Sequence, residues 1–164
     1  MKDRKRILLV FLTLIPVILL MVLIFSFSSQ EAHVSDQTSD GIVMRLIALL
    51  IPGFETLSES QQESIRHICA ILVRKGAHLT EYLLLGASLM LHIKAISVCR
   101  ALPREALLSF LAGALYAVSD ELHQLFVPGR SGEVKDVLLD SFGVLLGVLL
   151  IRLAARIRER RRCK

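Results

Sequence analysis

Histidine, carboxylate and amide side chains gather in three short stretches of the second half of the chain. These stretches are KGAHLTEY at 75–82, SDELHQ at 119–124 and DVLLD at 136–140. A histidine beside a carboxylate is suited to general acid–base chemistry. The candidate acid–base residues are therefore His78, Asp120, Glu121 and His123, and the candidate binding residues are Lys75, Glu81, Tyr82, Gln124, Arg130, Asp136 and Asp140.

The sequence contains no recognisable metal or nucleophile motif. It has no HExxH or ExxH pair, and Cys69, Cys99 and Cys163 are too widely spaced to indicate a zinc site or a disulfide framework. Asp120 and His123, three residues apart, could supply two ligands to a divalent metal, but this is the less favoured alternative. No cofactor is expected. The serines expected near the site are interpreted as polar lining: Ser28, Ser29, Ser119 and Ser141.

Each candidate also has a purely structural explanation. Lys75 could extend its amine from a helix end to the membrane interface. The histidines could donate hydrogen bonds between packed helices, and Asp136 and Asp140 could be stabilised by a helix N-terminus. The convergence of three separate segments is what favours a functional site.

The elements that must position these residues are apolar helices. The chain has 164 residues, of which 54% are hydrophobic, and its mean hydropathy is +0.60. Several apolar runs are long enough to cross a bilayer core of about 30 Å. The net charge of +5 comes mainly from residues beside apolar runs, which argues against a nucleic-acid partner. We predict an all-α membrane protein with one domain, 1–164, whose four transmembrane helices lie at about 7–25, 76–93, 106–127 and 134–153, followed by a basic tail at 154–164.

Two further features concern the first half of the chain. The first apolar run exceeds the usual hydrophobic region of a signal peptide, so an uncleaved anchor is favoured over a cleaved one. The apolar run 42–51, which Pro52 and Gly53 end, is too short to span and predicts an interfacial or re-entrant helix in the first outer loop. The sequence Ser60-Gln61-Gln62-Glu63 resembles a capping box and predicts a helix that begins near Ser60.

Lysine and arginine predict the orientation. They are concentrated at both termini and in the segment that contains Lys94, Arg100 and Arg104, whereas the first long loop is acidic on balance. The positive-inside rule then places both termini in the cytoplasm and the three polar stretches at the outer ends of their helices. No acidic or basic partner is expected in the inner halves, which makes a transporter less favoured.

The polar stretches must also find partners for their charges. A charge in the apolar core costs about 2.5–3.5 kcal/mol. The carboxylates therefore need a cation, such as Lys75, Arg130 or a protonated histidine, or must be neutral acids. At 100° per residue, each polar stripe shares its helix face with small residues, which allow close helix packing. The glycines on these faces are Gly86, Gly113, Gly143 and Gly147.

These residues resemble the VanZ-like family. The matching segments are FSFSSQ at 25–30, KGAHLTEY at 75–82, SDELHQLFVPGR at 119–130 and DVLLDSFG at 136–143. The resemblance implies a small bacterial integral membrane protein. Because the family's namesake is linked to low-level resistance to teicoplanin, a glycopeptide that acts on cell-wall precursors outside the membrane, it also implies a role at the cell envelope. It brings no settled catalytic residues.

Three functions stay open. The chain could protect against glycopeptides by binding or altering a lipid-linked or glycopeptide ligand at the outer surface. It could be an enzyme that acts on a phosphate-bearing lipid head group, with Lys75 and Arg130 holding phosphate and Asp120 or Glu121 moving protons. It could also be a small transporter, whose intramembrane acids would carry ions or protons.

Overall fold

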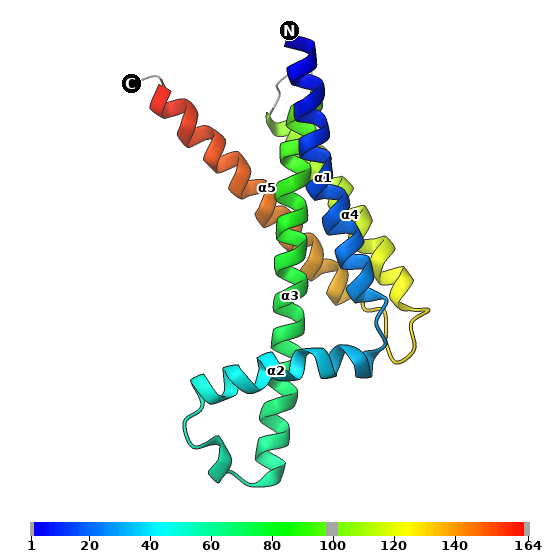
Figure 1. Ribbon diagram of the computed structural model, residues 1–164, viewed down its shortest axis with the longest axis vertical. Helices are drawn as coiled ribbons and strands as arrows, with labels where there is room; N and C mark the ends of the chain where they lie inside the picture. The colour runs from blue at the N-terminus through cyan, green and yellow to red at the C-terminus, as the bar shows by residue number, and fades with distance from the viewer. Residues whose placement is uncertain (1, 98–101, 163–164) are drawn as a thin grey trace.

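The computed structural model describes residues 2–97 and 102–162, and in this part of the chain every regular element is a helix (Figure 1). Arg100, Cys99 and Cys163, which the sequence argument used, lie outside it. The all-α prediction is confirmed. The elements are α1 (Lys2–Ser28), α2 (Ala32–Leu50), the 3-10 helix η1 (Phe54–Thr56), α3 (Glu59–Ile96), α4 (Leu102–Gln124) and α5 (Val134–Arg162).

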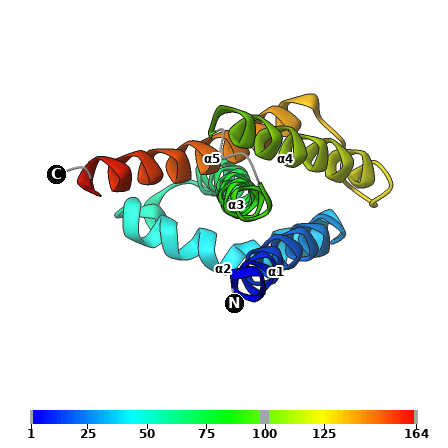
Figure 2. The same cartoon turned by 90° about the horizontal axis from the view of Figure 1, so that it is seen from above.

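The four long helices α1, α3, α4 and α5 form a bundle around α3. Viewed from above, α3 lies between α1 on one side and α4 and α5 on the other (Figure 2). Both ends of the chain lie at one end of the bundle, and α2 runs crosswise over α3 at the other (Figure 1). The bundle therefore has two distinct ends, and the polar stretches belong to the one nearer α2.

Three of these helices are long and apolar enough to cross a membrane. They cover Arg4–Ser28, Glu59–Ile96 and Val134–Arg158. The 23 residues of α4 would also reach across a bilayer. Its last turns, however, carry Asp120, Glu121 and His123, so its composition is less apolar. The four-span arrangement stays a prediction on this point.

The helix α3 joins the helix start predicted near Ser60 and the span predicted at 76–93 into one continuous helix. Its 38 residues would extend about 57 Å at 1.5 Å per residue, so the predicted span 76–93 is only its second half. It begins at Glu59, close to the expected Ser60, and its capping residue is Ser58, whose backbone N–H donates to Gln61 Oε1 at 3.1 Å. Its first half packs against α2 and η1 through the buried residues Val43, Ile47 and Phe54.

The ends of two other elements also differ from the sequence prediction. The helix α2 starts at Ala32 and not near Ile42, although it ends as expected just before Pro52 and Gly53, which has a φ of 81°. The basic segment after 153 was expected to be a tail. It continues α5 without a break to Arg162.

Glycines bring α5 directly against α3. A Cβ on Gly147 would lie 2.0 Å from the carbonyl oxygen of Leu83, and a Cβ on Gly86 would lie 2.3 Å from that of Val144. Both distances are far below van der Waals contact, so no larger residue fits without separating the helices. The predicted role of these glycines in helix packing is confirmed. The other glycines of the bundle in close contact with a neighbouring helix are Gly113 and Gly143.

The outside of the bundle is covered by exposed apolar side chains. On α1, for example, Leu8, Phe11 and Leu19 are each more than half exposed, whereas Val17 and Ile24 are buried against the other helices. A soluble protein rarely exposes so much continuous apolar surface. The surface is compatible with a lipid bilayer as its surroundings.

The end of the bundle near the termini contains a buried acid that the sequence analysis missed. Glu105, in the first turn of α4, is only 2% exposed, and neither of its carboxylate oxygens has a hydrogen-bond partner. The Nε atom of Arg152 on α5 is also buried without a partner. The expectation that the inner halves hold no such groups was wrong. Glu105 directly precedes the predicted span at 106–127, which is why it was not counted.

Candidate functional site

The three polar stretches meet at the end of the bundle opposite the chain termini. A cavity of about 270 Å³ lies between α3, α4, α5 and the 125–133 loop. Its volume is slightly below the usual range of small-molecule sites, about 300–1,000 Å³. Its lining includes most of the residues that the sequence singled out, namely Lys75, His78, Glu121, Gln124, Arg130, Asp136 and Asp140.

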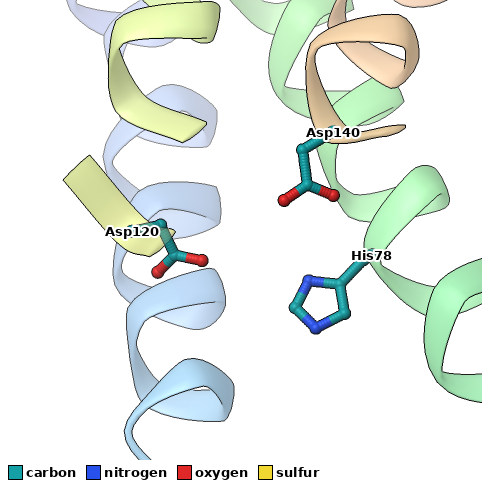
Figure 3. A group of neighbouring side chains, drawn as sticks. All are labelled: His78, Asp120 and Asp140. Atoms are coloured by element: carbon teal, nitrogen blue, oxygen red, sulfur yellow. The ribbon is translucent and has the colours of Figure 1, made fainter. Parts of the chain in front are cut away.

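Three side chains from three different helices converge beside this cavity. His78 on α3, Asp120 on α4 and Asp140 on α5 each direct a nitrogen or oxygen atom toward a common centre, and these atoms all lie within 4.8 Å of one another (Figure 3). Asp120 is 3% exposed and Asp140 is 1% exposed. His78 Nδ1, Asp120 Oδ1 and Asp140 Oδ1 are buried and have no hydrogen-bond partner. Such atoms are uncommon in native proteins, and their cluster makes this the candidate functional centre of the bundle.

The second oxygen of Asp120 is held by a small hydrogen-bond network. Oδ2 accepts from Ser28 Oγ at 2.7 Å and from Gln124 Nε2 at 3.3 Å. Gln124 Nε2 also lies 3.3 Å from Ser28 Oγ. Ser28, the last residue of α1, is completely buried. From the sequence, Ser28 was expected only to line the site, although the FSFSSQ segment that contains it was one of the segments that resemble the family.

An ion pair and a backbone hydrogen bond join the helices at the cavity wall. Lys75 on α3 donates to Asp136 Oδ1 on α5, which confirms Lys75 as a partner for one of the carboxylates. Glu121 Oε1 on α4 accepts from the backbone N–H of Glu133 at 2.6 Å, just before α5 begins. These contacts fix the start of α5, and with it the position of Asp140.

Arg130 ties the 125–133 loop to the end of α1. Its Nε donates to the carbonyl oxygen of Gln30 at 2.8 Å, and its Nη2 donates to that of Phe27 at 3.0 Å. Phe27 is in the last turn of α1, and Gln30 lies two residues beyond its end. The preceding Gly129 has a φ of 76°, which favours glycine in this turn. Arg130 therefore has a structural role in addition to its place in the cavity wall.

Besides Asp120, which lies just behind the cavity wall, three predicted residues lie outside the cavity lining. The ring of His123 stacks on Phe25 with 4.6 Å between centroids, and its Nε2 is 3.1 Å from Ser29 Oγ. Tyr82 is completely buried in the bundle core, and Glu81 is partly buried. The histidine that accompanies Asp120 is thus His78, from another helix, and not His123, three residues away.

Carboxylates outnumber cations in and beside the cavity. The cations of the lining are Arg74, Lys75 and Arg130, and the acids of the lining are Glu121, Glu133, Asp136 and Asp140. Asp120 adds a further acid just behind. Because Lys75 is paired with Asp136, the convergent centre itself is acidic and carries one histidine. Such a centre can hold a cation, or can exchange protons with a bound polar ligand.

A family model described as VanZ/LLP1 matches residues 12–155. No curated protein and no solved structure matches the chain. The matched range covers most of the chain, including the whole cavity and Ser28. The cavity is therefore part of the region that the family model describes.

Proposed function

The chain belongs to the VanZ/LLP1 family, and from this premise we propose that it contributes to low-level teicoplanin resistance through its polar cavity. In this proposal α1, α3, α4 and α5 are four membrane spans. Both termini lie in the cytoplasm, because lysine and arginine are concentrated there. The cavity then opens at the outer side, where glycopeptides and cell-wall precursors meet. The crosswise helix α2 lies at the outer interface.

The observation that carries this proposal is the unpartnered centre of His78, Asp120 and Asp140. An unpaired buried polar atom costs about 1–3 kcal/mol, and a bundle held only by packing would have no need for several of them together. Their position beside a cavity at one end of the bundle supports ligand binding there. The ligand would be a surface-exposed polar group such as that of a lipid-linked precursor.

The proposal is tested by substitution at the centre with matched controls. In a strain in which the chain raises the inhibitory concentration of teicoplanin, His78→Ala and Asp140→Ala should return it toward that of a strain without the gene. The controls are His67→Ala and Asp40→Ala, which change the same residue types at exposed positions of α3 and α2. Membrane levels of every variant are measured by immunoblot. Full resistance in both centre variants at normal levels would refute the proposal.

An enzyme that acts on a phosphate-bearing lipid head group is the second candidate. The observation in its favour is that Arg74, Lys75 and Arg130 line the same cavity as His78, since cations bind phosphate through strong charge-assisted hydrogen bonds. Mass spectrometry of membrane lipids separates it from pure binding. Loss of resistance with a changed lipid profile in Asp120→Asn favours the enzyme, and loss with an unchanged profile favours binding.

A small transporter is the third candidate, and Glu105 is the observation that favours it. A buried acid near the termini, together with the acidic centre at the other end, resembles the intramembrane acids of proton-coupled carriers. A proton-coupled transporter needs an acid at each end. Under this candidate, Glu105→Gln should abolish resistance as completely as Asp140→Ala does. Resistance that persists in Glu105→Gln at normal protein levels removes this candidate.

A further inference from the structure

We propose that His78, Asp120 and Asp140 form a binding site for a divalent transition-metal ion of the zinc or manganese type. This inference goes beyond the proposed function. Metal binding can be measured on the purified protein, and it does not require a role in resistance. It is built from one side chain each of α3, α4 and α5 (Figure 3). Sequence spacing alone could not find it, since the three residues are 42 and 20 positions apart along the chain.

The geometry of the three ligand atoms fits one ion after a small movement. The atoms lie within 4.8 Å of one another. Ligands about 2.0–2.2 Å from a tetrahedral zinc ion are themselves about 3.4 Å apart. The side chains must therefore approach by roughly an ångström, which rotation about their side-chain bonds can supply without moving the helices. Each of the three residues also has a buried atom without a hydrogen-bond partner, among them His78 Nδ1.

The chemistry of the donors selects the class of ion. One imidazole nitrogen with two carboxylate oxygens suits zinc and manganese, whereas magnesium and calcium prefer oxygen donors alone. The charge also balances, because two carboxylates neutralise a divalent ion. Net neutrality matters here, since Asp120 and Asp140 are almost fully buried and an uncompensated charge at such a depth is costly.

A second shell of hydrogen bonds orients Asp120 for this role. Ser28 Oγ and Gln124 Nε2 both donate to Oδ2, which leaves Oδ1 as the buried oxygen without a hydrogen-bond partner. Metal-binding carboxylates are commonly fixed in this way, with one oxygen hydrogen-bonded and the other on the metal. Ser28 comes from α1, so the site and its support together join all four helices of the bundle.

The proposed ion would have an open coordination position. Three protein ligands leave a fourth position for water or a ligand, as in catalytic zinc sites. His78 and Asp140 line the cavity, whereas Asp120 does not, so the open position faces the cavity. An ion there would offset the excess of carboxylates in the cavity wall. It would also attract the oxygen atoms of a phosphate or carboxylate group.

The direct test is the metal content of the purified full-length protein. The protein is purified in detergent through an affinity tag without histidine, stripped with a chelator, and titrated separately with Zn²⁺, Mn²⁺ and Co²⁺. We expect about one ion per chain, and Co²⁺ should give visible ligand-field absorption typical of low coordination. His78→Gln, Asp120→Asn and Asp140→Asn should each lose this binding, and Ser28→Ala should weaken it by about tenfold.

Matched controls separate the site from adventitious binding. His67→Gln on α3 and Asp40→Asn on α2 change exposed residues of the same types and should keep one ion per chain. Zinc should raise the unfolding temperature of the parent protein and of these controls, but not of the three ligand variants, because only a site in the folded state couples binding to stability. The proposal is overturned if the folded parent binds none of the three ions, or if His78→Gln and Asp140→Asn bind as the parent does.

Discussion

Asp120 illustrates, at the scale of single residues, how the buried centre is built. One of its oxygens is fixed by Ser28 and Gln124, and the other has no partner. An acid that served only to join α4 to α1 would have both oxygens engaged or one exposed to solvent. This separation of the two oxygens is what the proposed binding centre requires of Asp120.

The Ser28 hydroxyl is the residue-scale prediction. Ser28→Ala removes its 2.7 Å hydrogen bond to Asp120 and leaves a buried carboxylate less satisfied. We expect a loss of about 1–3 kcal/mol in unfolding free energy, measured as a lower melting temperature in detergent. The matched control is Ser26→Ala, two residues earlier. The Ser26 hydroxyl bonds only to the carbonyl of Val22 in its own helix and is exposed, so its removal should change stability by less than about 0.5 kcal/mol. Equal effects of the two substitutions would contradict this role of Ser28.

Close packing of α3 and α5 determines, at the scale of elements, where the polar groups meet. The glycines at 86, 143 and 147 bring the two backbones together one or two turns below His78 and Asp140. The ion pair between Lys75 and Asp136 then joins the same two helices one turn above. His78 and Asp140 lie between the glycine contacts and this ion pair. The geometry of the centre therefore depends on the contact between α3 and α5.

Substitution of Gly147 tests this dependence. In Gly147→Ala the new Cβ would lie 2.0 Å from the Leu83 carbonyl oxygen, so α5 must move away from α3. We expect a loss of about 1–3 kcal/mol or more in thermal or denaturant unfolding. Gly76→Ala is the control, because a Cβ there meets nothing within 4 Å and alanine is favoured in a helix by about 1 kcal/mol. It should stabilise the protein. A neutral Gly147→Ala would mean that the two helices are not in contact in the membrane.

The sequence predicted the helices and most of the residues that line the cavity. It did not predict which of these side chains contact one another across helices. Apolar length and the glycine stripes predicted the bundle, because both follow from local spacing. The pairing of Asp120 with Ser28 and His78 depends on which helices are neighbours, and spacing within a single helix cannot give this. For the same reason Asp120 and His123, three residues apart, suggested a joint role, whereas His123 turns toward Phe25 on α1. The helix start near Ser60 and the span at 76–93 were predicted as separate features, because the polar first half of α3 does not continue the apolar pattern of the span, and the structure joins the two in one helix.

At the scale of the whole molecule, the two ends of the bundle differ in the polar groups that they contain. One end has the cavity, the buried centre and the crosswise α2, and the other has both termini and the buried Glu105 (Figure 1). A helix of about 57 Å exceeds a bilayer core of about 30 Å, so α3 must extend beyond the membrane at one end. The small core formed with α2 and η1 around Phe54 covers the part that extends on the cavity side.

The orientation of the bundle is the prediction at this scale. In a variant without its native cysteines, Ser131→Cys in the 125–133 loop should react with a membrane-impermeant maleimide on intact cells, because the exposed loop at the cavity end faces outward. Arg160→Cys, exposed near the end of α5, should react only after the cells are permeabilised. The opposite pattern would place the cavity in the cytoplasm, where it could not meet a glycopeptide. Labelling of both positions on intact cells would instead remove α5 as a membrane span. Because the proposed resistance role requires an outward cavity whereas the metal site does not, this experiment separates the two proposals.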